Sequence, residues 1–277
     1  MRLIVAFTAL LVGGALLASA LTGAAPAQRG ALVWAVGDGD GSANAAALVR
    51  RIRRSRPQRF LYLGDVYPNG SARDFARAYA PTYGRLGGAT APTPGNHDRA
   101  RARSGYFPYW RGVKGAPQPS YYSFRVGGWQ ILSLNSETAH GGGSGQLRWL
   151  RARLRGAGTC RLAFWHRPRF SAGTVHGDQP DVAPFWRALR GHARIVLNGH
   201  DHDSQRLRPV AGITEFVAGA GGHGRYPLDR AYRRLAFGDS SHYAALRLRL
   251  RPGLARYAFV TADGQTLDSG QVRCRTS

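Results

Sequence analysis

From Ala31 onward the sequence alternates short apolar runs with stretches of helical periodicity, and this alternation constrains the fold more than any other feature. Strands are expected at 31–36, 60–63, 89–92, 121–126, 129–134, 161–165, 193–197, 214–218, 243–250, 255–261 and 266–273, and helices at 44–55, 72–83, 144–155 and 182–190. Tight hairpin turns are expected at Gly127-Gly128 and Asp263-Gly264. The order predicts an α/β fold, a four-layer α-β-β-α sandwich of two mixed sheets with flanking helices.

The first residues have the layout of a secretory signal, because Met1 and Arg2 precede an apolar run from 3 to 21 and then small residues. We expect residues 1–27 to be a signal peptide, with small-residue cleavage sites at 18–20 and 25–27. An uncleaved N-terminal membrane anchor is the alternative, since the apolar run is long for a signal. The expectation is an exported protein, either secreted or associated with the cell envelope.

Residues 31–277 are expected to form a single domain, since no linker-like tract divides them and their number suffices for one large core. In an oxidising compartment, Cys160 and Cys274 would form a disulfide that ties the C-terminal strand to the sheet. The alternative is two separate buried thiols.

The chain carries a formal charge of +24, from 39 basic and 15 acidic residues, and Lys114 is its only lysine. Such a balance attracts anions, including phosphate esters, nucleic acid and acidic envelope polymers. A simpler interpretation is that arginine replaces lysine on solvated faces. The basic runs at 50–54 and 148–155 favour it, because their spacing leaves Leu or Ile on the inner face of a predicted helix. We therefore expect no specific nucleic-acid partner and leave association with the anionic cell envelope open.

Five polar clusters each follow the end of an expected strand. They are Gly37-Asp38-Gly39-Asp40, Gly64-Asp65-Val66-Tyr67, Gly95-Asn96-His97-Asp98, Trp165-His166 and Gly199-His200-Asp201-His202. Taken singly, most have a structural explanation, such as a helix cap or a buried histidine. Because ligands bind at the carboxyl edge of α/β sheets, all five can converge on one crevice. Their carboxylate, amide and imidazole groups suit Zn, Mn or Fe, so together they predict a metal site.

In this order the clusters resemble the motifs of the calcineurin-like metallophosphoesterases, most closely the purple acid phosphatase branch and its bacterial members. The resemblance extends from Val33 to the C-terminus. It implies two divalent or mixed-valence metal ions, Fe, Zn or Mn. It also implies the roles of seven residues: Asp38 and His202 hold one metal, Asn96, His166 and His200 hold the other, Asp65 bridges them, and His97 binds the substrate phosphate or protonates the leaving oxygen.

The implied reaction is hydrolysis of a small phosphomonoester, with diesters as the nearest variant, by in-line attack of a hydroxide that bridges the metals. A competing hypothesis is an Arg-rich binding protein for nucleic acid or acidic envelope polymer whose metal site is not catalytic. A closed structural zinc site needs four ligands, whereas this chain offers six and an additional histidine, which favours the enzyme. The sequence does not indicate an oligomeric state.

The sequence departs from motifs of the superfamily at two places, the first in the purple acid phosphatase pattern and the second in the pattern of many other members. Tyr67 lies two residues after Asp65 instead of three, and Pro68 occupies the expected tyrosine position, so Tyr67 is either a metal ligand or a packing residue. Asp40 stands where many relatives have a metal-binding histidine, so it is either an additional oxygen ligand or a loop carboxylate.

Other histidines have weaker sequence support. His176 lies in a Gly-containing loop expected near the crevice, so it either contacts substrate or has no role there. His223 lies in a similar loop, and we expect no role for it. No function is assigned to His140, His192 or His242.

Overall fold

The computed structural model of this chain describes residues 30–156 and 160–274. The expected signal peptide or anchor at 1–27 lies outside this part of the chain. Among the described residues, no helix combines the length and the apolar character that crossing a membrane requires.

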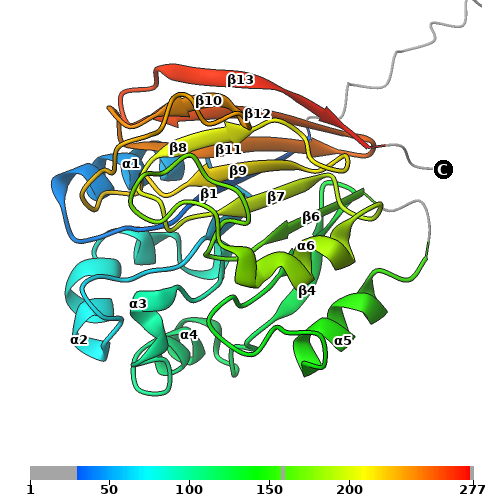
Figure 1. Ribbon diagram of the computed structural model, residues 1–277. Helices are drawn as coiled ribbons and strands as arrows, with labels where there is room; N and C mark the ends of the chain where they lie inside the picture. Colours follow the sequence, from blue (N-terminus) through cyan, green and yellow to red (C-terminus); the bar gives the residue numbers. More distant parts are fainter. Residues whose placement is uncertain (1–29, 157–159, 275–277) are drawn as a thin grey trace, which may run out of the picture.

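Thirteen strands of the described part form two sheets (Figure 1). The six-stranded sheet has the order β13-β12-β11-β1-β2-β3 and the seven-stranded sheet the order β10-β8-β9-β7-β6-β5-β4. The strand bounds are β1 Ala31–Val36, β2 Arg59–Tyr62, β3 Thr90–Pro92, β4 Tyr122–Val126, β5 Trp129–Ser133, β6 Cys160–Phe164, β7 Ile195–Asn198, β8 Ser204–Leu207, β9 Thr214–Ala218, β10 Leu235–Asp239, β11 Ala244–Arg251, β12 Leu254–Thr261 and β13 Thr266–Arg273. Both sheets are mixed: β1, β2 and β3 run parallel beside an antiparallel β11–β13 meander, and β5, β6, β7 and β9 run parallel between antiparallel edges.

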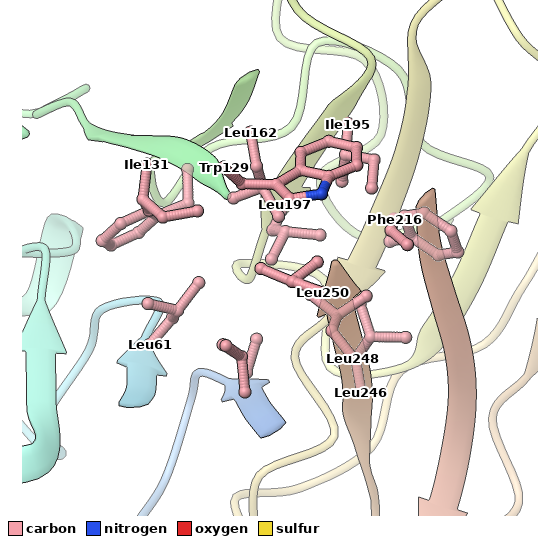
Figure 2. Close-up of a cluster of buried hydrophobic side chains, with 14 of the residues drawn as sticks. Leu61, Trp129, Ile131, Leu162, Ile195, Leu197, Phe216, Leu246, Leu248 and Leu250 are labelled. Carbon is pink, nitrogen blue, oxygen red and sulfur yellow. The ribbon is translucent and has the colours of Figure 1, made fainter. Parts of the chain in front are cut away.

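The central core lies between the two sheets, as Figure 2 shows. Strand β11 illustrates how the sequence builds it, because successive side chains of a strand point to opposite faces. Leu246, Leu248 and Leu250 point inward and are fully buried, whereas the arginines between them point outward. The three leucines pack against side chains of the other sheet, including Ile195 and Phe216.

Helices cover the outer faces of the sheets and complete the four expected layers. Their bounds are α1 Ala43–Arg54, α2 Ala72–Asp74, α3 Asn96–Arg99, α4 Tyr106–Lys114, α5 Gly145–Arg153 and α6 Ala183–Leu189. Helix α1 buries Leu48 and Ile52 against the outer side of β1, where Trp34 lies. Helices α5 and α6 pack in the same way against the seven-stranded sheet, through residues such as Leu150 and Phe185. The predicted fold class is confirmed.

The local predictions succeeded where turn chemistry or a long apolar pattern was present. Gly127 and Gly128 both have positive φ, 58° and 80°, as the tight turn between β4 and β5 requires.

The prediction of a continuous helix at 72–83 was wrong. Helix α2 passes into a π-helical segment, Phe75–Tyr79, and a separate 3-10 helix starts at Tyr83. Pro81 accounts for the break, because proline removes a helical hydrogen bond and disfavours helix in the residue before it.

Cys160 and Cys274 form a disulfide, with their Cα atoms 5.6 Å apart. Cys160 opens β6 of the seven-stranded sheet and Cys274 follows the last residue of β13 in the other sheet. The expected bridge is confirmed, and it joins the two sheets to each other.

Replacing both cysteines by alanine (C160A/C274A) is expected to lower the free energy of unfolding by about 2–5 kcal/mol, because the bridge closes a long loop in the unfolded chain. Urea denaturation with and without reductant measures this loss. The reduced wild type is the matched control and should show a similar loss. If the double variant unfolded at the same urea concentration as the oxidised wild type, the stabilising role of the bridge would be refuted.

Candidate metal centre

The predicted ligands gather at the carboxyl ends of neighbouring parallel strands. Asp38 follows β1, Asp65 follows β2 and Asn96 begins the short helix α3 after β3. His166 follows β6 and His200 follows β7 in the other sheet. Ligands converge at this edge in α/β sheets, and here the site draws on both sheets.

One group of ligand atoms forms around Asp65, Tyr67 and His202. The Tyr67 hydroxyl lies 2.7 Å from Nε2 of His202 and donates to Oδ2 of Asp65 at 3.3 Å. Oδ1 of Asp38 lies 3.6 Å from Nε2 of His202. The carboxylates of Asp38 and Asp65, the His202 imidazole and the Tyr67 phenol therefore lie close together.

A second group forms around Nε2 of His166. This nitrogen lies 2.9 Å from Oδ1 of Asn96, 3.2 Å from Nδ1 of His200 and 3.3 Å from Oδ2 of Asp65. Oδ2 of Asp65 thus belongs to both groups. The family resemblance implies that these residues hold two metals with Asp65 between them, and the structure brings the residues together.

The backbone is held in an unusual conformation at three of these residues. Asp38, Asp65 and His200 have φ of 60°, 62° and 74°, in the left-handed region that non-glycine residues seldom occupy. Such a conformation costs on the order of 1–3 kcal/mol and persists where the surroundings fix it, most often at functional sites.

Two motif glycines are required by close packing against the carboxylates. A Cβ atom on Gly95 would overlap Oδ1 of Asp65, and one on Gly199 would overlap Oδ2 of Asp38. A side chain at either position would displace a candidate ligand, which explains why glycine opens both motifs.

Backbone carbonyl groups orient the two histidines. Nδ1 of His166 donates to the Leu63 carbonyl at 2.9 Å, and Nδ1 of His202 donates to the Gly224 carbonyl at 2.5 Å. Each bond leaves Nε2 facing the ligand groups described above, and a neutral ring held in this way presents its lone pair there. Metal-binding histidines are commonly held in this way by a hydrogen bond from the other ring nitrogen.

The electrostatics differ between the histidines, because burial keeps His200 and His202 neutral near neutral pH whereas the carboxylates favour a protonated His166. Burial lowers the pKa of His202 to about 4 and lowers that of His200 further, so both rings are uncharged near neutral pH and can bind a cation. Burial would also lower the pKa of His166, but Asp65 and Asp38 outweigh it and raise that pKa to about 10. Burial raises the pKa of Asp38 well above its usual value, with the nearby Asp65 adding to the effect.

The donor set fits metal ions. Asp38 is fully buried, and its Oδ1 has no hydrogen-bond partner among the described residues. Oxygen and nitrogen atoms of Asp38, Asp65 and His166 lie within 4.8 Å of one another. An unpaired buried carboxylate oxygen is unfavourable unless a cation satisfies it, so this arrangement points to a metal ligand.

Asp98 supports Asp65, although no role was predicted for it. Its carboxylate accepts hydrogen bonds from the backbone N–H groups of Asp65, Val66 and Gly95, at 2.9–3.1 Å. These bonds tie the loop after β2 to the loop after β3. The signal was present in the sequence, since Asp98 completes the Gly-Asn-His-Asp cluster.

Three further rings lie beside the ligand groups. His97 donates its backbone N–H to Oδ1 of Asp65 at 2.9 Å, and its Nδ1 bonds the Pro68 carbonyl at 2.6 Å. His176 stacks on His200 with ring centroids 4.0 Å apart. Tyr226, which the sequence did not suggest, stacks on His202 at 3.9 Å.

The remaining candidates have contacts that the structure defines. His223 stacks on Tyr67 at 3.7 Å and lies 3.5 Å from Oδ2 of Asp40. Oδ1 of Asp40 accepts the backbone N–H of Ser42 at 2.9 Å. Neither contact of Asp40 is with a candidate ligand, which favours the loop-carboxylate interpretation.

Glu215 anchors the loop that carries His166. It is buried on β9, and its two oxygens accept the backbone N–H groups of Arg169 and Phe170 at 2.8 and 3.0 Å. Burial raises the pKa of Glu215 to about 8, although these bonds oppose the shift. An isolated glutamate in a strand carries no sequence signal for such a role.

Glu215 is expected to make stability depend on pH. Its folded pKa of about 8 exceeds its ordinary value of 4.5, so its contribution is complete below pH 4.5 and is lost as the pH rises to about 8. Relative to a Glu215→Gln variant, the wild type should lose a few kcal/mol of unfolding free energy across this window. Urea denaturation of both proteins in chelator measures the difference, and parallel pH profiles would contradict it.

Comparisons with known proteins agree with this geometry. The sequence model of the family described as calcineurin-like phosphoesterase matches residues 32–204, more than half of the chain. No protein with a curated description matches this chain in sequence.

Three solved structures share the fold at low sequence identity. A purple acid phosphatase from yellow lupin (Lupinus luteus) seeds superposes with a TM-score of 0.70 and 15% identity, covering 88% of this chain and 53% of that one. GAP50, the anchor in the inner membrane complex of Plasmodium, gives 0.74 and 12%, covering 90% of each chain. A dimetal phosphatase from Danio rerio gives 0.61 and 16%, covering 90% of this chain and 100% of that one. This chain therefore spans about half the length of the lupin enzyme.

Proposed function

Because this chain belongs to the calcineurin-like phosphoesterase family, whose members are metal-dependent phosphoester hydrolases, we propose that it is an exported dinuclear phosphoesterase acting on small phosphomonoesters. The observation that supports it best is the position of Asp65, whose Oδ2 lies at once 3.3 Å from the Tyr67 hydroxyl and 3.3 Å from Nε2 of His166. One carboxylate oxygen shared by two ligand groups suits a bridge between two cations.

The proposed ligand sets follow the two groups. Asp38, His202 and the Tyr67 hydroxyl would hold the first metal, and Asn96, His166 and His200 the second, with Asp65 common to both. Tyr67 is included because its hydroxyl reaches two ligands of the first group even though it lies one residue earlier than the usual tyrosine. Burial and the nearby Asp38 raise the pKa of Tyr67, so this phenol stays protonated unless a cation offsets the carboxylates.

The protein's own residues would position the substrate and handle protons. When bound, the two metal ions would supply an activated water and neutralise charge on the phosphate. His97 is held by the Pro68 carbonyl through Nδ1, which leaves Nε2 to contact the phosphate or protonate the leaving oxygen. His176, which is exposed and stacks on His200, would contact the ester group.

The choice of monoesters and the exported location rest on separate support. The shared fold with a purple acid phosphatase and the sequence resemblance to that branch favour monoesters over diesters. The signal-like residues 1–27 and the disulfide favour an oxidising compartment outside the cytoplasm. Fe, Zn and Mn all fit the oxygen and nitrogen donors.

A binding protein with an inactive metal site is the competing proposal. GAP50 is named as an anchor and has the same fold, so the fold alone does not distinguish the two functions. The complete set of six ligands with His97 beside it favours catalysis, because a structural site needs no more than four.

The decisive assay measures turnover of a chromogenic aryl phosphomonoester and the corresponding diester after loading with Zn, Mn or Fe. We expect the monoester to be hydrolysed faster, and activity to fall by at least about 100-fold in chelator or in Asp38→Asn, because both remove a bound cation. Asp263→Asn, in the β12–β13 turn, is the matched control and should remain active. If the metal-loaded protein turned over neither ester, the enzyme proposal would fail.

Tyr67 can be tested by spectroscopy. Iron-loaded oxidised protein is expected to show a tyrosinate-to-iron charge-transfer band in the visible region, and Tyr67→Phe should abolish it. Tyr226→Phe is the control. The Tyr226 ring stacks on His202, and no described contact joins its hydroxyl to a candidate ligand. A band that persists in Tyr67→Phe, or fails to form at full ferric loading, would exclude Tyr67 as a ligand.

A further inference from the structure

A basic groove lies on the outer face of β11, β12 and β13, away from the metal centre. Its cavity has a volume of about 370 Å³, and its lining includes Arg247, Arg249, Arg256, Thr266 and Ser269. We call these five residues the basic groove. The strand order places β12 and β13 at the edge of the six-stranded sheet opposite β2 and β3, and β13 lies on the outside of the molecule (Figure 1).

The strand register brings the three arginines together. Arg249 lies directly opposite Arg256 on the antiparallel partner, and Arg247 lies two residues from Arg249 on the same face. Arg247 is opposite Ala258, which in turn is opposite Ser269 on β13. The small side chain of Ala258 therefore leaves space at the centre of the groove, with cationic groups and a hydroxyl around it.

In the part of the chain that the structure describes, no carboxylate forms an ion pair with these arginines. Within the described residues, the arginines that form ion pairs are Arg167, Arg169 and Arg206, none of which lines the groove. The pKa of Arg247 is lowered by burial and by the positive charges of Arg249 and Arg51. Its guanidinium lies 6.0 Å from the Trp34 ring, which helps to hold it in place.

Like charges directly opposite each other destabilise a sheet, and Arg249 and Arg256 are such a pair. A bound anion would remove the repulsion. Arginine is suited to phosphate, because its planar guanidinium donates two parallel hydrogen bonds to a phosphate's oxygens. The hydroxyl groups of Thr266 and Ser269 add neutral donors.

We propose that the basic groove is a second anion site, distinct from the metal centre, that binds the phosphate groups of a linear phosphate polymer. Three guanidinium groups spread over two strands suit consecutive phosphates of one chain. A single free phosphate offers the same chemistry, and the experiment separates the two sources.

The test compares two triple variants with the same change in net charge. One is R247Q/R249Q/R256Q in the groove, and the control is R148Q/R151Q/R153Q on the exposed face of α5. Binding of linear polyphosphate and of orthophosphate is measured by calorimetry at several salt concentrations, with chelator present so that the metal centre is empty. Thermal unfolding confirms that both variants are folded.

We expect the groove variant to bind polyphosphate on the order of tenfold more weakly, with a salt slope smaller by about 2–3, whereas the control changes by less than about twofold. Polyphosphate binding without orthophosphate binding would support a polymer ligand. Saturable orthophosphate binding that the groove variant alone loses would support the phosphate site with a free anion as its source. Equal weakening in both triple variants would overturn the proposal, because binding would then reflect only the total charge. Absence of binding by the wild type would overturn it as well.

Discussion

The carboxylate of Asp65 is the group around which the whole site is arranged. Its Oδ2 serves both ligand groups, its Oδ1 accepts the His97 N–H, and its own backbone N–H is held by Asp98. Placing it there requires a left-handed backbone conformation and a glycine at position 95 for the loop to approach. These features are individually unfavourable or restrictive, and they are compatible with a stable fold because the strands on which the loops stand are deeply buried.

The site also depends on how the two sheets pack. Asp38, Asp65 and Asn96 follow strands of the six-stranded sheet, whereas His166 and His200 follow strands of the seven-stranded sheet. The ligand groups therefore exist only when the sheets are correctly aligned. The inter-sheet core fixes that alignment through close packing, and the disulfide joins the sheets at a second point. Packing energy is in this way the source of the precise geometry at the metal centre.

Sequence patterns predicted the parts of the molecule that rest on local rules. The strands with long apolar runs, the Gly127-Gly128 turn and the convergence of the ligands all follow from periodicity, turn chemistry and the carboxyl-edge rule. Strands β8 and β10 and helices α3 and α4 were not predicted, since they are short or lack a clear apolar period. The roles of Glu215 and Tyr226 depend on partners that are distant in the sequence, so no local pattern could reveal them.

The distribution of charge explains why bound cations matter for an anionic substrate. Six of the 15 acidic residues are buried, namely Asp38, Asp65, Asp98, Asp201, Asp203 and Glu215, so the surface is even more positive than the net charge of +24 indicates. A positive surface field attracts anions such as phosphate esters. At the site itself, Asp38 and Asp65 lie together, and carboxylates alone do not attract the phosphate that the surface field draws in. Bound cations would add positive charge at these carboxylates, so the residues that do not attract phosphate by themselves would hold the ions that do.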